Sequence, residues 1–130
     1  MTAPGASFKD HGSGEDVDRL CQMAVEGRQA VRALAQWSGR LHLSEAELQI
    51  LWGLRAARSQ GIDQTTLATQ LALSPALVSA SVEKLRLRGM IAHQPAGSDR
   101  RRHLWQLSAD GREALQRVVR AAGESREAAA

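Results

Sequence analysis

The most constraining part of this chain is the segment 67–111, in which two short amphipathic helices are followed by an arginine-rich hairpin. The first predicted helix carries apolar residues at helical spacing on one side: Leu67, Ala68 and Leu71. Asp63 or Thr65 is expected to cap it. A short helix with one apolar side needs neighbouring elements to cover that side, and the next residues supply one.

A second helix is predicted over 75–88. Ser74 is a good N-cap, and Pro75 suits the first helical position because no amide donor is needed there. Three apolar residues repeat at steps of four and three and are expected to face the core: Val78, Val82 and Leu85. Gly89 follows as a C-cap glycine would, so the helix is expected to stop at this point.

A hairpin is predicted after this helix. Residues 90–94 and 103–107 have the pattern of two short strands, with turn residues over 95–98 between them. Three arginines follow Asp99 at the tip: Arg100, Arg101 and Arg102. Ser108 is then placed to cap a last helix. Two helices, a tight turn and a hairpin predict a mainly α fold with a small β-hairpin wing, the winged helix-turn-helix.

The same residues resemble the MarR family of bacterial transcription regulators. The order and spacing of three matches carry the resemblance: Leu67-Ala68, Leu71, Leu73-Ser74-Pro75, Val78-Ser79, Val82, Leu85 and Gly89; then Asp99-x-Arg101; then Leu107-Ser108-x-x-Gly111. The resemblance implies a homodimer that binds a pseudo-palindromic operator in double-stranded DNA. In the family, release by a small-molecule effector or an oxidant is common.

The expected DNA contacts follow from this arrangement. The N-terminal residues of the second helix of a helix-turn-helix meet base edges, and the wing is expected to reach the neighbouring backbone or minor groove. The DNA-binding candidates are Ser74, Ala76, Leu77, Ser79, Ala80, Lys84, Arg100, Arg101 and Arg102. Asp99 is expected to orient the wing, because its carboxylate can hold the turn amides or the Arg101 guanidinium. Arg101 is predicted to be the most important single contact.

Charge and motif content agree with a nucleic-acid partner. The net charge is +3, and residues 84–103 hold six lysines and arginines against one acid, whereas residues 1–18 hold one lysine against four acids. Positive charge therefore gathers where phosphates would lie. We find no membrane-spanning run, phosphate-loop motif, dinucleotide motif or metal-ligand cluster, so no membrane, cofactor or metal is expected. The single cysteine fits a reducing cytoplasm.

The N-terminal part is expected to support dimerisation. Residues 1–14 are predicted to be a disordered arm, and a dimerisation helix is assigned to 15–42, with its helical part over about 15–40. Its apolar stripe follows three- and four-residue steps: Val17, Leu20, Ala24, Val31, Leu34 and Leu41. This stripe predicts that the helix carries most of the homodimer interface.

The DNA-binding lobe is assigned to 43–108. Ser44 and Glu47 form a capping box at its first helix, which is expected to end at Gly61. Residues 109–130 are expected to hold one helix, over about 109–122, and a frayed tail. The family usually ends in two helices that interlock the dimer, so this C-terminal part is shorter than the resemblance implies.

Three alternatives stay open. Leu77 and Ala80 are aliphatic where the family often has polar residues, which favours a winged-helix module that binds protein without DNA. Cys21, early in the first helix, allows a redox-sensing regulator, although the chain has no tyrosine to support the thiolate. The three tryptophans fit the core or an interface, and any of them can line an effector pocket: Trp37, Trp52 and Trp105. An enzyme is not expected, because no base accompanies Cys21.

Overall fold

The computed structural model describes residues 13–94 and 103–129, and its elements follow the predicted order. They are α2 (Gly14–Gly39), α3 (Glu45–Ala57), η1 (a 3-10 helix, Arg58–Gln60), α4 (Gln64–Leu71), α5 (Pro75–Leu87), β1 (Ile91–His93), β2 (Trp105–Leu107) and α6 (Ala109–Ala129). By their contacts they divide into two compact units, Met1–Ala33 and Leu34–Ala130. The predicted fold class, mainly α with a small β-hairpin, is confirmed.

Helix α2 begins and ends within one residue of the helix expected over 15–40. Between residues 14 and 33 no residue of α2 is buried. The large apolar side chains exposed along this part of the helix are Val17, Leu20, Met23, Val25 and Val31. In the single chain, α2 therefore presents apolar surface to solvent.

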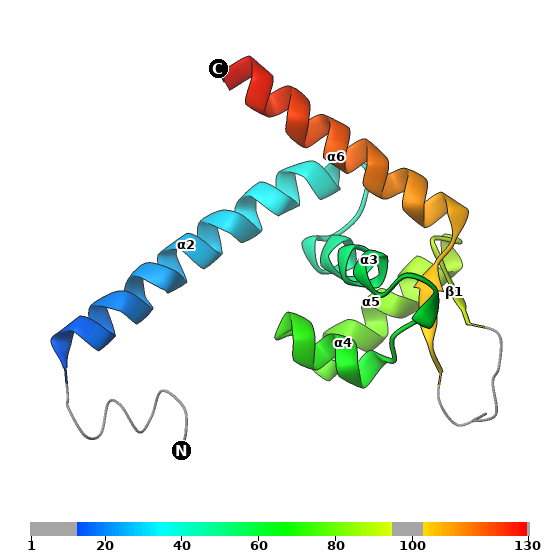
Figure 1. Ribbon diagram of the computed structural model, residues 1–130, viewed down its shortest axis with the longest axis horizontal. Helices are drawn as coiled ribbons and strands as arrows, with labels where there is room; N and C mark the ends of the chain where they lie inside the picture. Colours follow the sequence, from blue (N-terminus) through cyan, green and yellow to red (C-terminus); the bar gives the residue numbers. More distant parts are fainter. Residues whose placement is uncertain (1–12, 95–102, 130) are drawn as a thin grey trace. The chain divides into compact units, whose positions relative to one another are not determined.

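The core of the second unit is built around α3, which Figure 1 shows among α4, α5 and α6. The predicted capping box fixes its start. The Ser44 hydroxyl accepts from the Glu47 amide at 3.0 Å, and the Ser44 amide donates to Glu47 Oε1 at 2.6 Å. The apolar residues that α3 buries are Ala46, Leu48, Ile50, Leu51 and Leu54. Because these residues lie on more than one side of α3, the remaining elements can pack around it.

The helix expected to end at Gly61 ends earlier, at Ala57, and η1 fills the interval. Gly61 has φ +73°, and a Cβ there would lie 3.1 Å from the carbonyl oxygen of Trp105. At this close approach Ile62 forms an isolated antiparallel bridge with the hairpin. The Ile62 amide donates to the Trp105 carbonyl at 3.0 Å, and the Trp105 amide donates to the Ile62 carbonyl at 2.9 Å. This bridge was not predicted, because nothing in the local sequence pattern indicates the partner of an isolated extended residue.

Strands β1 and β2 pair antiparallel in the register Ile91↔Leu107, Ala92↔Gln106 and His93↔Trp105. They are shorter than the strands expected over 90–94 and 103–107. The Gln94 amide still donates to the Leu104 carbonyl at 2.7 Å, so the ladder continues one step past the strands. The wing tip, residues 95–102, lies outside the described residues.

Helix α6 is longer than predicted. It was expected to end near residue 122, but it runs to Ala129. The prediction was wrong because it gave Gly123 too much weight as a terminator. A glycine inside a helix costs only about 1 kcal/mol relative to alanine, and the residues after it are mostly alanine, glutamate and arginine, which favour helix.

Hydrogen bonds of Ser108 connect the first turn of α6 to the residues just before β1. The Ser108 hydroxyl accepts from the Gly111 amide at 3.1 Å and donates to the Gly89 carbonyl at 2.6 Å. The Ser108 amide donates to the Met90 carbonyl at 3.0 Å. A Cβ at Gly111 would lie 2.1 Å from that same Met90 oxygen, so the helix can approach the hairpin only with glycine there.

Candidate nucleic-acid interface

A tight turn joins α4 to α5 and sets the angle between the two helices. Asp63 caps α4, because its side chain accepts from the Thr66 amide at 2.7 Å. At the other end Ala72 adopts the left-handed conformation, with φ 53° and ψ 43°. The Leu73 amide donates back to the Ala68 carbonyl at 3.1 Å, which closes the helix end.

Helix α5 begins as predicted. Ser74 is its N-cap, with its hydroxyl accepting from the Leu77 amide at 3.1 Å, and Pro75 occupies the first turn. The predicted core residues Val78, Val82 and Leu85 are all buried, together with Ser81. Ser81 therefore cannot contact DNA bases, since only 4% of the residue is exposed. Its position three residues after Val78 placed it on the buried side of the helix.

The opposite side of α5 presents the candidate readers to solvent. The exposed residues are Ser74, Ala76, Leu77, Ser79, Ala80 and Lys84. Leu77 is 43% exposed, so its side chain is available for contact with a partner. This face offers three kinds of contact group: aliphatic surface, which can meet a thymine methyl, the hydroxyl of Ser79 and the ammonium group of Lys84.

Two basic side chains at the end of α5, Arg86 and Arg88, were expected to lie where phosphates bind, but both are held by other groups of the protein. Arg86 is held by Glu83 through two hydrogen bonds, of 3.0 Å from Nε and 2.6 Å from Nη2. The hydrogen bond to Arg86 lowers the pKa of the Glu83 carboxyl, and the same contact raises the pKa of Arg86. Arg88 donates to the backbone carbonyls of His42 and Leu41, at 2.7 and 2.9 Å. Of the three basic residues at 84–88, only Lys84 has none of these contacts among the described residues.

The end of α5 directs the chain into the wing. The Gly89 amide donates to the Arg86 carbonyl at 2.9 Å and the Met90 amide to the Leu85 carbonyl at 3.0 Å, the paired bonds of a Schellman motif. Gly89 has φ +73°, as its predicted role as the C-cap glycine requires. The hairpin therefore leaves the same lobe directly after α5. Asp99 and the three expected wing arginines lie outside the described residues.

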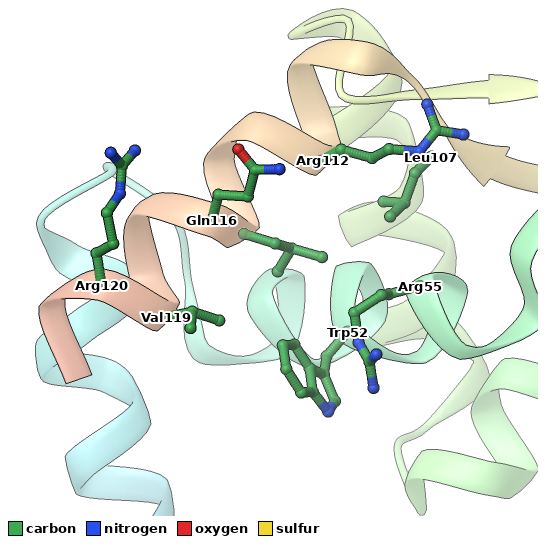
Figure 2. A pocket seen from close by; sticks show the side chains of 8 residues that line it. Trp52, Arg55, Leu107, Arg112, Gln116, Val119 and Arg120 are labelled. Atoms are coloured by element: carbon green, nitrogen blue, oxygen red, sulfur yellow. The ribbon is translucent and has the colours of Figure 1, made fainter. Parts of the chain in front are cut away.

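A pocket of about 600 Å³ lies between α3 and α6 (Figure 2). Trp52 and Arg55 line it from α3, and the Arg55 guanidinium lies 4.0 Å from the centre of the Trp52 ring. On the other side α6 contributes Arg112, Gln116, Val119 and Arg120, and Figure 2 shows Val119 on the side facing α3 and the Gln116 and Arg120 side chains pointing away from it. Its apolar wall and basic rim make the pocket suitable for a small amphipathic molecule.

The remaining candidates are distributed through the fold. Trp105 is buried in the core at 4% exposure, whereas Trp52 is 46% exposed and Trp37 is partly buried. Cys21 is a free, exposed thiol on α2. Within residues 13–94 and 103–129, no cluster of three metal-ligating side chains occurs. In the same part of the chain, no helix is long and apolar enough to cross a membrane.

These elements define a class of protein, the winged helix-turn-helix proteins, with α4 and α5 as the helix-turn-helix and the β1–β2 hairpin as the wing. Within that class, the chain has the fold of MarR-type transcription regulators of known structure. No protein-family model matches the chain, and no curated protein matches it.

Three solved structures illustrate the likeness. A mutant of S. aureus MepR bound to an oligodeoxyribonucleotide has a TM-score of 0.69 at 19% identity, covering 86% of this chain and 80% of that chain. The apo form of wild-type MarR from E. coli has a TM-score of 0.67 at 21% identity, covering 78% and 72%. The transcriptional regulator BldR from Sulfolobus solfataricus has a TM-score of 0.71 at 21% identity, covering 85% and 81%.

Proposed function

We propose that this chain is a transcription regulator that binds double-stranded DNA as a homodimer. The observation that carries the proposal is the exposed N-terminal face of α5, capped by Ser74 and followed directly by the wing. In helix-turn-helix proteins this face enters the major groove. The structural likeness to MepR bound to an oligodeoxyribonucleotide supports the same use here. Such a protein would act where the chromosome is, in the cytoplasm.

The dimer is proposed to form mainly through α2, over the assigned region 15–42. The support is the apolar surface that α2 exposes, including Leu20 and Val31. Obligate interfaces of this kind bury roughly 2,000 Å² or more. Two recognition helices related by the dimer axis would meet a pseudo-palindromic operator. Deleting residues 1–30 should give monomer or aggregate in sedimentation, and an unchanged dimer mass would contradict this assignment.

Base reading by α5 is proposed to rest on contact with thymine methyl groups and on the Ser79 hydroxyl. Leu77→Ala removes three carbons of the largest exposed apolar group near the helix start, each worth about 0.8 kcal/mol when buried, so it should weaken operator binding by about 5- to 50-fold. Leu87→Ala is the matched control, since Leu87 is 70% exposed at the far end of α5. Equal losses from both variants would show that the effect is not base reading.

The wing is proposed to contribute through Arg101, oriented by Asp99. Alanine substitution of Arg101 should weaken DNA binding more than substitution of Arg100 or Arg102. Binding titrations with melting temperatures for all three variants compare the losses directly. If Arg101→Ala costs less affinity than both neighbours, the wing assignment is wrong.

Salt dependence separates the regulator from the rival protein-interaction module. Each phosphate neutralised should change the slope of log K against log salt by about −0.9. A dimer making about 6 to 10 phosphate contacts should therefore lose affinity steeply with salt. A nearly flat response would favour a protein partner for the exposed Leu77 face instead.

A small-molecule effector is a second proposed partner. An apolar pocket of about 300 Å³ within the second unit is lined by Trp37, Trp52 and neighbouring aliphatic side chains. Trp52 also borders the pocket of Figure 2, so one tryptophan faces both spaces. Quenching of tryptophan fluorescence by a bound ligand, lost in Trp52→Phe, would test this.

The redox role of Cys21 stays a prediction that oxidant treatment followed by DNA titration would check.

A further inference from the structure

A separate pocket lies between the first turn of α4 and the base of the wing. Its volume is about 650 Å³, and its walls are the side chains of 63–66 on one side and two histidines with Trp105 on the other. The recognition face of α5 does not contribute to it. The pocket therefore needs an explanation of its own.

The two histidines of this pocket are held next to each other. The His93 ring stacks on Trp105, with ring centres 4.0 Å apart and planes 30° apart. The His103 ring centre lies 5.3 Å from that of His93. Trp105 is buried, whereas both imidazoles are exposed. The buried indole thus serves as a platform that fixes His93 at the surface, with His103 beside it.

The charge of this pocket depends on the two imidazoles. Among the described lining residues Asp63 is the only other titratable group, and its carboxylate caps α4 through the Thr66 amide at 2.7 Å. Gln64 and the threonines are neutral hydrogen-bonding residues. With both imidazoles neutral, the only charge in the described lining is the Asp63 carboxylate, whereas protonation of both imidazoles adds two positive charges.

Building on the proposed DNA binding, we propose that His93 and His103 form a proton-dependent contact for a backbone phosphate of DNA. The first helix of a helix-turn-helix crosses the DNA backbone, and in this chain that helix is α4. The pocket at its start, beside the wing, is where a phosphate would pass. An imidazolium donates charge-assisted hydrogen bonds to phosphate oxygens, which a neutral imidazole cannot match.

The direction of the pH effect follows from this contact. Histidine side chains change charge between about pH 5 and 8. Because the protonated pair binds phosphate more tightly, DNA binding takes up protons and affinity rises as pH falls. Between pH 8 and pH 6 the affinity for DNA should rise by about five- to tenfold at low salt. The salt slope should steepen by about 0.9 for each histidine that neutralises a phosphate.

The test measures binding of the full chain to a fluorescently labelled duplex of mixed sequence, at constant ionic strength and with EDTA present. Wild type and His42→Gln should show the full pH response, since His42 is exposed but lies in the connection between α2 and α3. His103→Gln should lose part of the response and His93→Gln/His103→Gln nearly all of it. At pH 8 all four proteins should bind alike.

His103→Gln keeps the stack of His93 on Trp105, so its reduced response cannot arise from lost packing at Trp105. Equal wild-type affinity at pH 6 and pH 8 would overturn the proposal, as would a full response in the double variant. A response seen only without EDTA would assign the pair to a metal ion instead and also overturn it. No binding of the duplex at either pH is a different result, because it refutes the DNA-binding function itself.

Discussion

Replacing Gly111 by alanine should unfold the junction between α6 and the hairpin. The new Cβ would lie 2.1 Å from the Met90 carbonyl oxygen and 3.2 Å from Leu107 Cδ2, whereas ordinary contact begins near 3.4 Å. The helix start must retreat by about 1 Å or more, which costs about 1–3 kcal/mol as overpacking. The retreat also strains the two hydrogen bonds of Ser108 to the hairpin, worth about 1 kcal/mol each.

Alanine recovers about 1 kcal/mol of helix propensity at this position, so the net loss in free energy of unfolding should be about 2–4 kcal/mol. Urea denaturation at a fixed protein concentration measures this loss. Gly123→Ala is the matched control in the same helix, because a Cβ there meets nothing within 4 Å. It should stabilise the protein by up to about 1 kcal/mol. A Gly111→Ala variant within about 0.5 kcal/mol of wild type would refute the packing argument.

Other changes test single contacts by the same denaturation measurement. Arg88→Ala should cost about 1–2 kcal/mol because it removes two hydrogen bonds to backbone carbonyls, whereas Arg86→Ala, which breaks an exposed ion pair, should cost less than about 0.5 kcal/mol. Equal costs would contradict the structural role of Arg88. Ser44→Ala should cost about 1 kcal/mol through loss of the capping box. Gly61→Ala should cost at least about 1–2 kcal/mol, since φ is +73° there and a Cβ would crowd the hairpin. An unchanged midpoint for Gly61→Ala would contradict that strain.

Features that depend on residues close together in the chain could be predicted from the sequence. The caps at Ser44 and Ser74 and the glycine after α5 depend on residues within one turn of one another, and the structure confirms all three. The buried side of α5 was also predictable, and a full helical projection would have included Ser81 with Val78.

Contacts between residues far apart in the chain could not be predicted from the sequence. Arg88 was counted as part of a basic DNA-binding face, but its partners are backbone carbonyls 46 and 47 residues earlier in the chain. Gly111 belongs to the Leu-Ser-x-x-Gly match, yet only the fold shows that the glycine admits the Met90 carbonyl. Neither relation has a local pattern, because each arises when separate elements meet.

The exposed face of α2 has a consequence for how much of each chain is folded in the cell. Isolated helices of this length are marginal in water, and no residue between 14 and 33 is buried in the single chain. Under the proposed homodimer, partner binding supplies the missing packing, so the helix content of this segment depends on protein concentration. Under this proposal, the concentration of the chain in the cell would set the fraction of chains in which α2 is folded. Under the same proposal, chains above the dimer threshold would keep α2 ordered, and unpaired chains would expose it to proteases, which would remove them before they occupied one half of the proposed operator.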